Sequence, residues 1–275
     1  MNGGALHDLQ VLPRVLAFEL RKATAFRLGF VLQKLLRGVP RQAVMVLIYV
    51  AIFRSTSATQ IRGYTLPDLI AYLVWTALLI KCLTDEHTLD VGEQIFDGYV
   101  TKYLVMPVSF LTLLWGRFVQ HTLVQVLSAG LLYAVGALLL PAYWPVPHSA
   151  LALVQATTLL LLGAACYHLV HATLGMLAFW LDVVWSLHNM FAFVANFVAG
   201  SLVPIALMPA SVQDVFSALF PYWTVFAPAE LLIGRMGTDD FVRGVAVLSA
   251  TLVALQLLSL FTWKRGLVRY AGSGA

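Results

Sequence analysis

Few side chains in this sequence have the types and spacing that catalysis or metal binding would need. His168 and His171 share one apolar stretch and His121 lies in another, so the three could relay protons or hold a metal ion. Histidines in such surroundings more often bond to neighbouring helices. The sequence shows no coherent Ser/His/Asp or Cys/His grouping and no GxxxxGK[ST] phosphate loop. We therefore expect no catalysis, metal or nucleotide cofactor on this chain.

Five of the thirteen acidic residues gather in one short stretch, DEHTLDVGEQIFDG, residues 85–98. Asp85, Glu86, His87 and Asp90 could approach a divalent cation, but nothing in their spacing fixes a metal-like geometry. Asp90 followed by Glu93 instead matches a helical capping box, and Gly98 is a suitable helix stop. The pattern predicts a short helix.

This expected helix has two distinct faces. Val91, Ile95 and Tyr99 recur at helical spacing as an apolar stripe, whereas Glu93 and Asp97 form an acidic face. An apolar stripe with acidic flanks suits insertion into a groove of a partner protein. The alternative is a solvated loop, since acidic residues contribute little to membrane orientation.

The composition indicates that lipid surrounds most of the chain. The sequence is 60% hydrophobic and 11% charged, with a mean hydropathy of +0.85, far from the average soluble domain. A membrane-spanning helix needs about 20 mostly apolar residues. Six segments are predicted to span: Leu35–Phe53, Leu66–Leu83, Leu111–Leu140, Ala150–Trp180, Val183–Val203 and Phe241–Trp263.

The basic residues predict the orientation. With both termini cytoplasmic, thirteen of the seventeen Lys and Arg residues lie inside, as the positive-inside rule requires. We expect a cytoplasmic arm at 1–34 and one transmembrane domain at 35–275, with a cytoplasmic loop at 84–107 and a cytoplasmic tail at 264–275.

Two segments do not have the pattern of simple membrane spans. Residues 13–36 resemble an interfacial helix that places basic side chains near lipid headgroups, although a cytoplasmic extension of the first span is the alternative. Residues 202–234 are apolar but carry four prolines, which favours re-entrant helices between spans five and six. The expected headgroup contacts are Arg21, Lys22, Arg27 and Lys34.

Span five carries a polar stripe of Trp185, Asn189 and Asn196. Intramembrane polar groups are costly and often functional, so one interpretation is the lining of a transport path. The other is interhelical hydrogen bonding.

Several stretches, in this order, resemble permeases of type-two ABC exporters, in particular the bacterial "ABC-2 family transporter protein" group. They are GEQIFDGYVTKYLVMPVS after span two, LAFWLD at the end of span four, AGSLVPIALMP after span five, FAPAELLIG in the re-entrant region and the ending WKRGLVRYAGSGA. One departure is that the group often has a basic residue after its Ile, where this chain has Phe96 and Asp97.

The resemblance implies an all-α polytopic permease of the bacterial cytoplasmic membrane that is itself non-catalytic. Two copies of a separate ATPase, which bind ATP and Mg, would dock on the loop after span two, and the permease would pair as a homodimer or with a related permease. The expected docking residues are Leu89, Asp90, Val91, Glu93, Ile95, Phe96, Asp97, Gly98 and Tyr99.

Two rival classes fit less well, and no nucleic-acid partner is expected. An ion-coupled secondary transporter would usually show an internal repeat and a mid-span charge, and we find no repeat. An intramembrane enzyme would need a coherent acid, base or nucleophile set. The sequence does not define the substrate.

Overall fold

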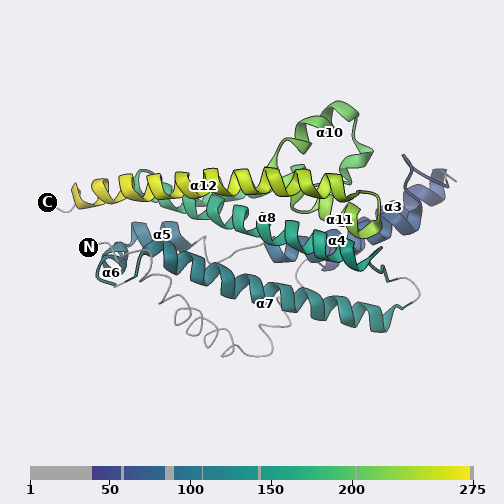
Figure 1. Ribbon diagram of the computed structural model, residues 1–275, viewed down its shortest axis with the longest axis horizontal. Helices are drawn as coiled ribbons and strands as arrows, with labels where there is room; N and C mark the ends of the chain where they lie inside the picture. Colours follow the sequence, from purple (N-terminus) through teal and green to yellow (C-terminus); the bar gives the residue numbers. More distant parts are fainter. Residues whose placement is uncertain are drawn as a thin grey trace.

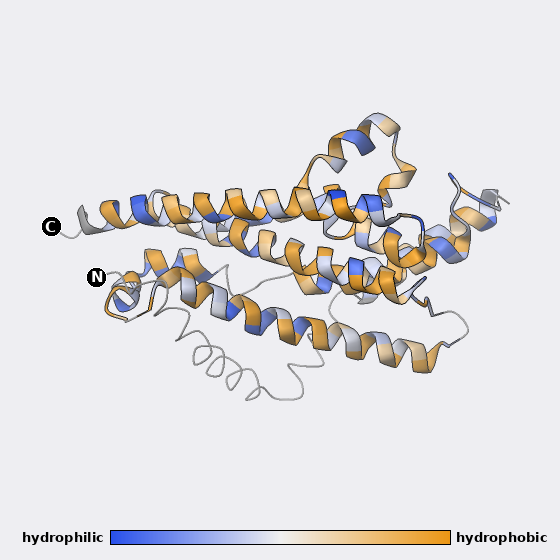
Figure 2. Cartoon of the chain, in the orientation of Figure 1, coloured by the Kyte–Doolittle hydropathy of each residue, from blue (hydrophilic) through white to orange (hydrophobic). Residues whose placement is uncertain are grey.

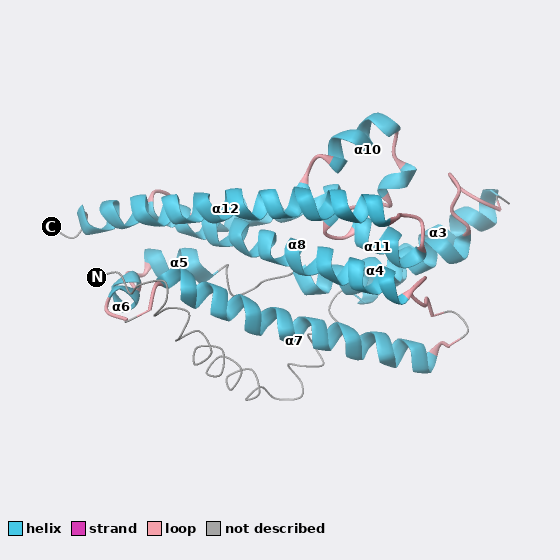
Figure 3. Ribbon diagram, in the orientation of Figure 1, coloured by secondary structure: helices cyan, strands magenta, loops and turns pink. Residues whose placement is uncertain are grey.

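A computed structural model of the chain describes residues 39–56, 59–83, 90–106, 108–141, 144–201 and 203–272. These residues form helices joined by short connections, and no strand occurs among them (Figure 3). The predicted interfacial helix and its headgroup contacts Arg21, Lys22, Arg27 and Lys34 lie outside the described residues, as does Leu89. The α-helices are α3 (Val39–Thr56), α4 (Leu66–Leu83), α5 (Asp90–Phe96), α6 (Val100–Leu104), α7 (Phe110–Leu139), α8 (Ala150–Met176), α9 (Trp185–Val198), α10 (Ala210–Ser217), α11 (Phe226–Ile233) and α12 (Thr238–Gly272). Short 3₁₀ helices are η1 (Leu177–Phe179), η2 (Ile205–Leu207) and η3 (Phe220–Trp223).

The centre of the molecule is the pair α8 and α12, which run side by side, with α4 and α11 packed against α8 (Figure 1). Apolar side chains from all of these helices meet in one core. Its fully buried members include Leu73, Leu159, Trp223, Leu231 and Leu248. Helices α5 and α6 lie at the end of the molecule where α12 finishes, and α3 and α10 lie toward the other end (Figure 1).

Two serines set where the long helices α7 and α8 begin. The hydroxyls of Ser109 and Ser149 accept hydrogen bonds from the amides of Thr112 (3.2 Å) and Ala152 (3.0 Å). Each bond satisfies one amide that has no partner within its own helix, so each serine is an N-cap.

Many large apolar side chains are exposed on the outer surface. Leu123, Leu127 and Leu131 recur every four residues on α7 and are all exposed, with Val135 and Leu138 continuing toward its end. Hydrophobic colour recurs along the whole length of the long helices in Figure 2. Soluble proteins rarely expose contiguous apolar patches of this kind, so these faces suit lipid.

Four helical stretches of the described chain are long and apolar enough to cross a membrane: Leu66–Leu83, Phe110–Leu139, Ala150–Phe179 and Thr238–Tyr270. They match four of the six predicted spans. Within the described residues, neither of the other two predicted spans reaches the length needed to cross a membrane. Only Gln42–Thr56 of α3 forms an apolar helix, and α9 has 14 residues, about 21 Å at 1.5 Å per residue against a hydrocarbon core of about 30 Å. The exact number of spans therefore stays a prediction.

The proline-rich region is helical but sharply broken. The stretches Ala210–Ser217 and Phe220–Ile233 meet at an angle of 89°, which fits a broken span or a re-entrant loop. Helix α11 is buried from Phe226 to Leu232, as irregular backbone at membrane depth must be. Residues 264–272 of the predicted cytoplasmic tail continue α12 without a break.

Candidate functional site

Helix α5 forms within the acidic stretch and ends where the sequence predicts. The amide of Gly98 donates to the carbonyl of Ile95 (3.2 Å), and the amide of Tyr99 donates to that of Gln94 (2.9 Å). These two bonds are those of a Schellman motif, which needs a left-handed residue at its turn. Gly98 supplies it with φ of +77°. Asp90 is the first helical residue.

Two of the three residues of the predicted apolar stripe, Val91 and Ile95, face the chain's own interior. Val91 is 0% exposed and Ile95 is 5% exposed, and both belong to a buried cluster with Ala172 and Met176 of α8 and Phe179 of η1. The prediction that Val91 and Ile95 insert into a partner therefore needs correction. Helical periodicity shows that a face is buried, but it does not show which surface covers it.

Two glycines, Gly92 and Gly175, allow α5 to pack closely against its neighbours. A Cβ on Gly175 of α8 would lie 2.9 Å from Cβ of Val91, and a Cβ on Gly92 would lie 2.3 Å from a methyl group of Val184. Neither position has room for a larger residue. The backbone of α5 is thus pressed onto the end of α8 and the segment that leads into α9.

Further contacts join α5 and α6 to α7 and α12. Tyr270 of α12 donates a hydrogen bond of 3.1 Å to the carbonyl of Gly98. Tyr103 of α6 donates to the side-chain carbonyl of Gln94 and packs against Phe110 of α7, whose ring stacks on Trp263 of α12 at 4.2 Å between centroids. The segment is therefore a platform fixed to the ends of three long helices.

The outward side of this platform is apolar and acidic. Phe96 is 67% exposed and Tyr99 is 58% exposed, and the acidic Glu93 and Asp97 are exposed beside them. Asp90 is exposed at the start of α5, and Leu104 and Val105 are exposed after α6. We call Glu93, Phe96, Asp97, Tyr99, Leu104 and Val105 the platform surface. Phe96 and Tyr99, rather than Val91 and Ile95, are the protruding apolar groups.

The polar stripe on α9 also faces outward. Trp185 and Asn189 are exposed, and Asn196 is half-buried. The amides of Asn189 and Asn196 donate to the carbonyls four residues earlier, of Trp185 (3.1 Å) and Ala192 (2.7 Å). Within the described chain their donors therefore bond to their own helix. The interhelical bonding considered as the alternative does not occur there for these donors.

The three histidines of the relay hypothesis, His121, His168 and His171, are buried. Nδ1 of His171 lies 2.9 Å from Nδ1 of His188, with the rings stacked at 5.2 Å between centroids. His168 packs against the rings of Trp115 and Phe118. No group of three or more His, Cys, Asp or Glu suited to a metal ion occurs among the described residues.

A charged cluster that the sequence analysis did not single out lies in the proline-rich region. Glu230 of α11 is 4% exposed, accepts a hydrogen bond of 2.7 Å from the phenol of Tyr64, and pairs with Arg235 at 3.3 Å. Burial raises the pKa of Tyr64, so the phenol keeps the proton that it donates. Arg235 also lies over the Tyr64 ring at 3.8 Å and donates to the carbonyl of Gly63 (3.0 Å). The only sequence signal was an acid within an apolar stretch.

Long helices with exposed apolar faces and an apolar and acidic platform at one end define a polytopic α-helical membrane protein. A family model described as "ABC-2 family transporter protein" matches residues 40–274, and the chain belongs to that family. The protein is thus a membrane permease of an ABC transporter, a component that is generally non-catalytic and typically partners with an ABC ATPase. A search of curated proteins gives no match.

Proposed function

We propose that this permease exports its substrate by coupling to a separate ABC ATPase, which docks on the platform surface around Phe96. The observation that supports this proposal most strongly is that the platform surface is exposed, whereas the helices that bear it, α5 and α6, are packed against α7, α8 and α12. A partner that pushes on the platform would move the ends of these helices together. Such coupling needs a rigid lever, and the Val91–Gly175 contact provides one.

The assembly proposed is a pair of permeases with two ATPase copies. The exposed Trp185 and Asn189, with the half-buried Asn196, would line the export path between the two permeases. A two-fold homodimer is the simplest arrangement, because a single copy has no matching second half. A related permease as the second half is the competing arrangement.

The orientation proposed has both termini in the cytoplasm of a bacterial cell, with the platform surface on the same side. The basic residues support it, because Lys102 and Arg117 near the platform and Lys264, Arg265 and Arg269 on α12 then lie inside. ATP and Mg would bind to the partner ATPase, which supplies the hydrolysis.

Replacing Phe96 by Asp tests the docking surface. An aspartate there must lose water on docking without gaining a partner, which should lower the affinity for the ATPase roughly thirtyfold or more. The tagged permease would be purified from native membranes and the ATPase retained per permease would be quantified by mass spectrometry.

The matched control is Val146→Asp, which introduces the same charge at an exposed loop position between α7 and α8. We expect this control to retain the ATPase and the Phe96→Asp variant to lose it at equal membrane level. Normal retention and ATP-dependent export by Phe96→Asp would refute docking at this surface. Charge reversal at Glu93 and Asp97 should weaken docking less, and the effect should shrink in high salt.

A further inference from the structure

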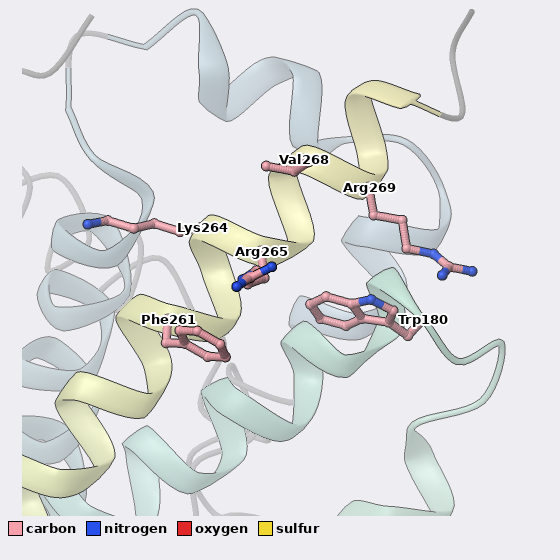
Figure 4. Close-up of a pocket in the computed structure, with 6 residues that line it drawn as sticks. All are labelled: Trp180, Phe261, Lys264, Arg265, Val268 and Arg269. Atoms are coloured by element: carbon pink, nitrogen blue, oxygen red, sulfur yellow. The ribbon is translucent and has the colours of Figure 1, made fainter.

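A basic and aromatic groove lies along the last turns of α12. It has a volume of about 580 Å³ and is lined by Trp180, Phe261, Lys264, Arg265, Val268 and Arg269 (Figure 4). All but Trp180 belong to α12; Trp180 follows η1. In Figure 4, Arg269 and Trp180 extend on the same side of α12, and Lys264 extends on the other.

The groove follows from the local packing of α12 on η1. A Cβ on Gly266 would lie 2.0 Å from a ring carbon of Phe179, so only glycine lets α12 approach η1 this closely. This contact brings the neighbouring Trp180 alongside α12. Phe261, Arg265 and Arg269 follow one another at intervals of four residues, so they share one face of the helix.

The groove carries positive charge that the described chain does not neutralise. Among the described residues, no carboxylate lies within ion-pair distance of Lys264, Arg265 or Arg269. The guanidinium of Arg265 lies over the ring of Phe261 at 5.4 Å, a contact that orients the cation without neutralising it. Three cations within six residues repel one another, so an anion in the groove would be stabilised.

The position of the groove along α12 corresponds to the membrane–water boundary. The helix has 35 residues and is about 52 Å long, whereas the hydrocarbon core is about 30 Å thick. The apolar sequence ends at Trp263, and the basic residues begin at Lys264. Tryptophans such as Trp180 and Trp263 favour this interface, and basic residues there lie at the depth of lipid phosphates.

We propose that this groove binds the phosphate-bearing headgroup of an anionic phospholipid. Arg265 and Arg269 contact the phosphate, Lys264 adds to the positive field, and Phe261 contacts the upper part of the acyl chains. In the proposed orientation the groove opens to the cytoplasmic leaflet, where anionic lipids attract basic segments. The proposal depends on the chain being a membrane protein and not on ATPase docking.

The test compares lipid binding by purified, delipidated full-length permease in detergent. Phosphatidylglycerol and phosphatidylcholine would each be titrated, and bound lipid would be counted by native mass spectrometry. We expect Arg265→Gln/Arg269→Gln to weaken phosphatidylglycerol binding about thirtyfold and to leave phosphatidylcholine binding unchanged. Equal phosphatidylglycerol binding by this variant and the unmodified chain would overturn the proposal.

Two further variants separate charge at the groove from total charge and from folding. Arg54→Gln/Arg243→Gln removes the same charge from exposed positions elsewhere and should bind like the unmodified chain; an equal loss there would overturn the proposal. Arg265→Lys/Arg269→Lys keeps the charge and should keep most of the binding; if it also loses the lipid, headgroup charge recognition is wrong. Complete displacement of the lipid by millimolar inorganic phosphate would show a free-phosphate site instead.

Discussion

The phenol of Tyr270, two residues before the end of α12, donates a hydrogen bond of 3.1 Å to the carbonyl of Gly98, where α5 turns. The two residues are 172 positions apart in the sequence, so this bond joins the last long helix directly to the platform. Because Gly98 belongs to the Schellman turn, a displacement of α5 would be transmitted to α12 through a short and fully defined path.

Removing this bond should loosen the platform without unfolding the protein. A neutral hydrogen bond contributes about 0.5–1.5 kcal/mol, so Tyr270→Phe should accelerate amide hydrogen exchange over residues 90–104 by roughly two- to tenfold. Tyr133→Phe is the matched control, because the Tyr133 hydroxyl donates an equally long bond to the carbonyl of Pro145 between α7 and α8. Unchanged exchange at the platform in Tyr270→Phe would show that the bond is not part of its support.

Because Ile95 is buried, replacing it should lower the stability of the permease, whereas replacing an exposed docking residue should not. Ile95→Ala should destabilise the permease by about 2–5 kcal/mol, because it opens a cavity between α5 and α8. Phe96→Ala removes an exposed ring and should change stability by no more than about 0.5 kcal/mol. Thermal unfolding in detergent distinguishes them. If Ile95→Ala has the same unfolding temperature as the unmodified protein yet loses the ATPase, Ile95 faces the partner after all.

The sequence was most informative where length and composition alone decide the outcome. Leu66–Leu83 was predicted as a span and is a helix with the same ends, because an unbroken apolar run bounded by polar residues has few alternatives. The stop at Gly98 was predicted for a similarly local reason, since glycine adopts a left-handed turn without strain.

Contacts between distant segments could not be predicted in this way. The periodicity of Val91 and Ile95 identified a buried face, but its cover, Ala172 and Met176, comes from a helix some 80 positions later. Glu230 was missed for the same reason, because its partner Tyr64 is 166 positions away. Sequence spacing describes one element at a time, whereas these groups acquire their roles only when elements pack together.

Because Glu230 and Arg235 form an ion pair, the loss of stability on removing Arg235 should depend on whether the Glu230 carboxylate is present. Arg235→Met leaves the buried carboxyl of Glu230 without its cation and should destabilise the permease by about 1–3 kcal/mol, because Arg235 is itself partly exposed and the pair is not fully desolvated. The same change in a Glu230→Gln background should cost much less, because no buried charge is stranded. Melting temperatures of the two single variants and the double variant give the coupling energy. If the changes in melting temperature of the two single variants simply add in the double variant, Arg235 stabilises the protein through its contacts with Tyr64 and Gly63 and not through Glu230.

The predicted orientation can be measured by cysteine labelling from outside the cell. Single cysteines at Ser55 and Thr238 should react with a membrane-impermeant reagent, whereas a cysteine at Thr101 on the platform should react only after the membrane is opened. All three positions are exposed, and the native Cys82 and Cys166 are buried, which keeps the background low. Labelling of Thr101 from outside would place the platform on the wrong side for an ATPase.

The outward stripe on α9 yields the prediction that bears most directly on transport. The Asn196 amide donates to the carbonyl of Ala192 in its own helix, and the hydroxyl of Ser201 lies 3.5 Å from its oxygen, so few contacts depend on it. Asn196→Leu should therefore leave the melting temperature nearly unchanged. If the stripe lines the path between two permeases, the same variant should alter export or substrate-stimulated ATPase activity severalfold, because a polar group of the lining is lost. Val194→Leu, an apolar exchange at a neighbouring exposed position, is the control and should behave like the unmodified chain. If Asn196→Leu instead fails to assemble while each assembled complex exports normally, the asparagine is a structural contact between subunits and the path lies elsewhere.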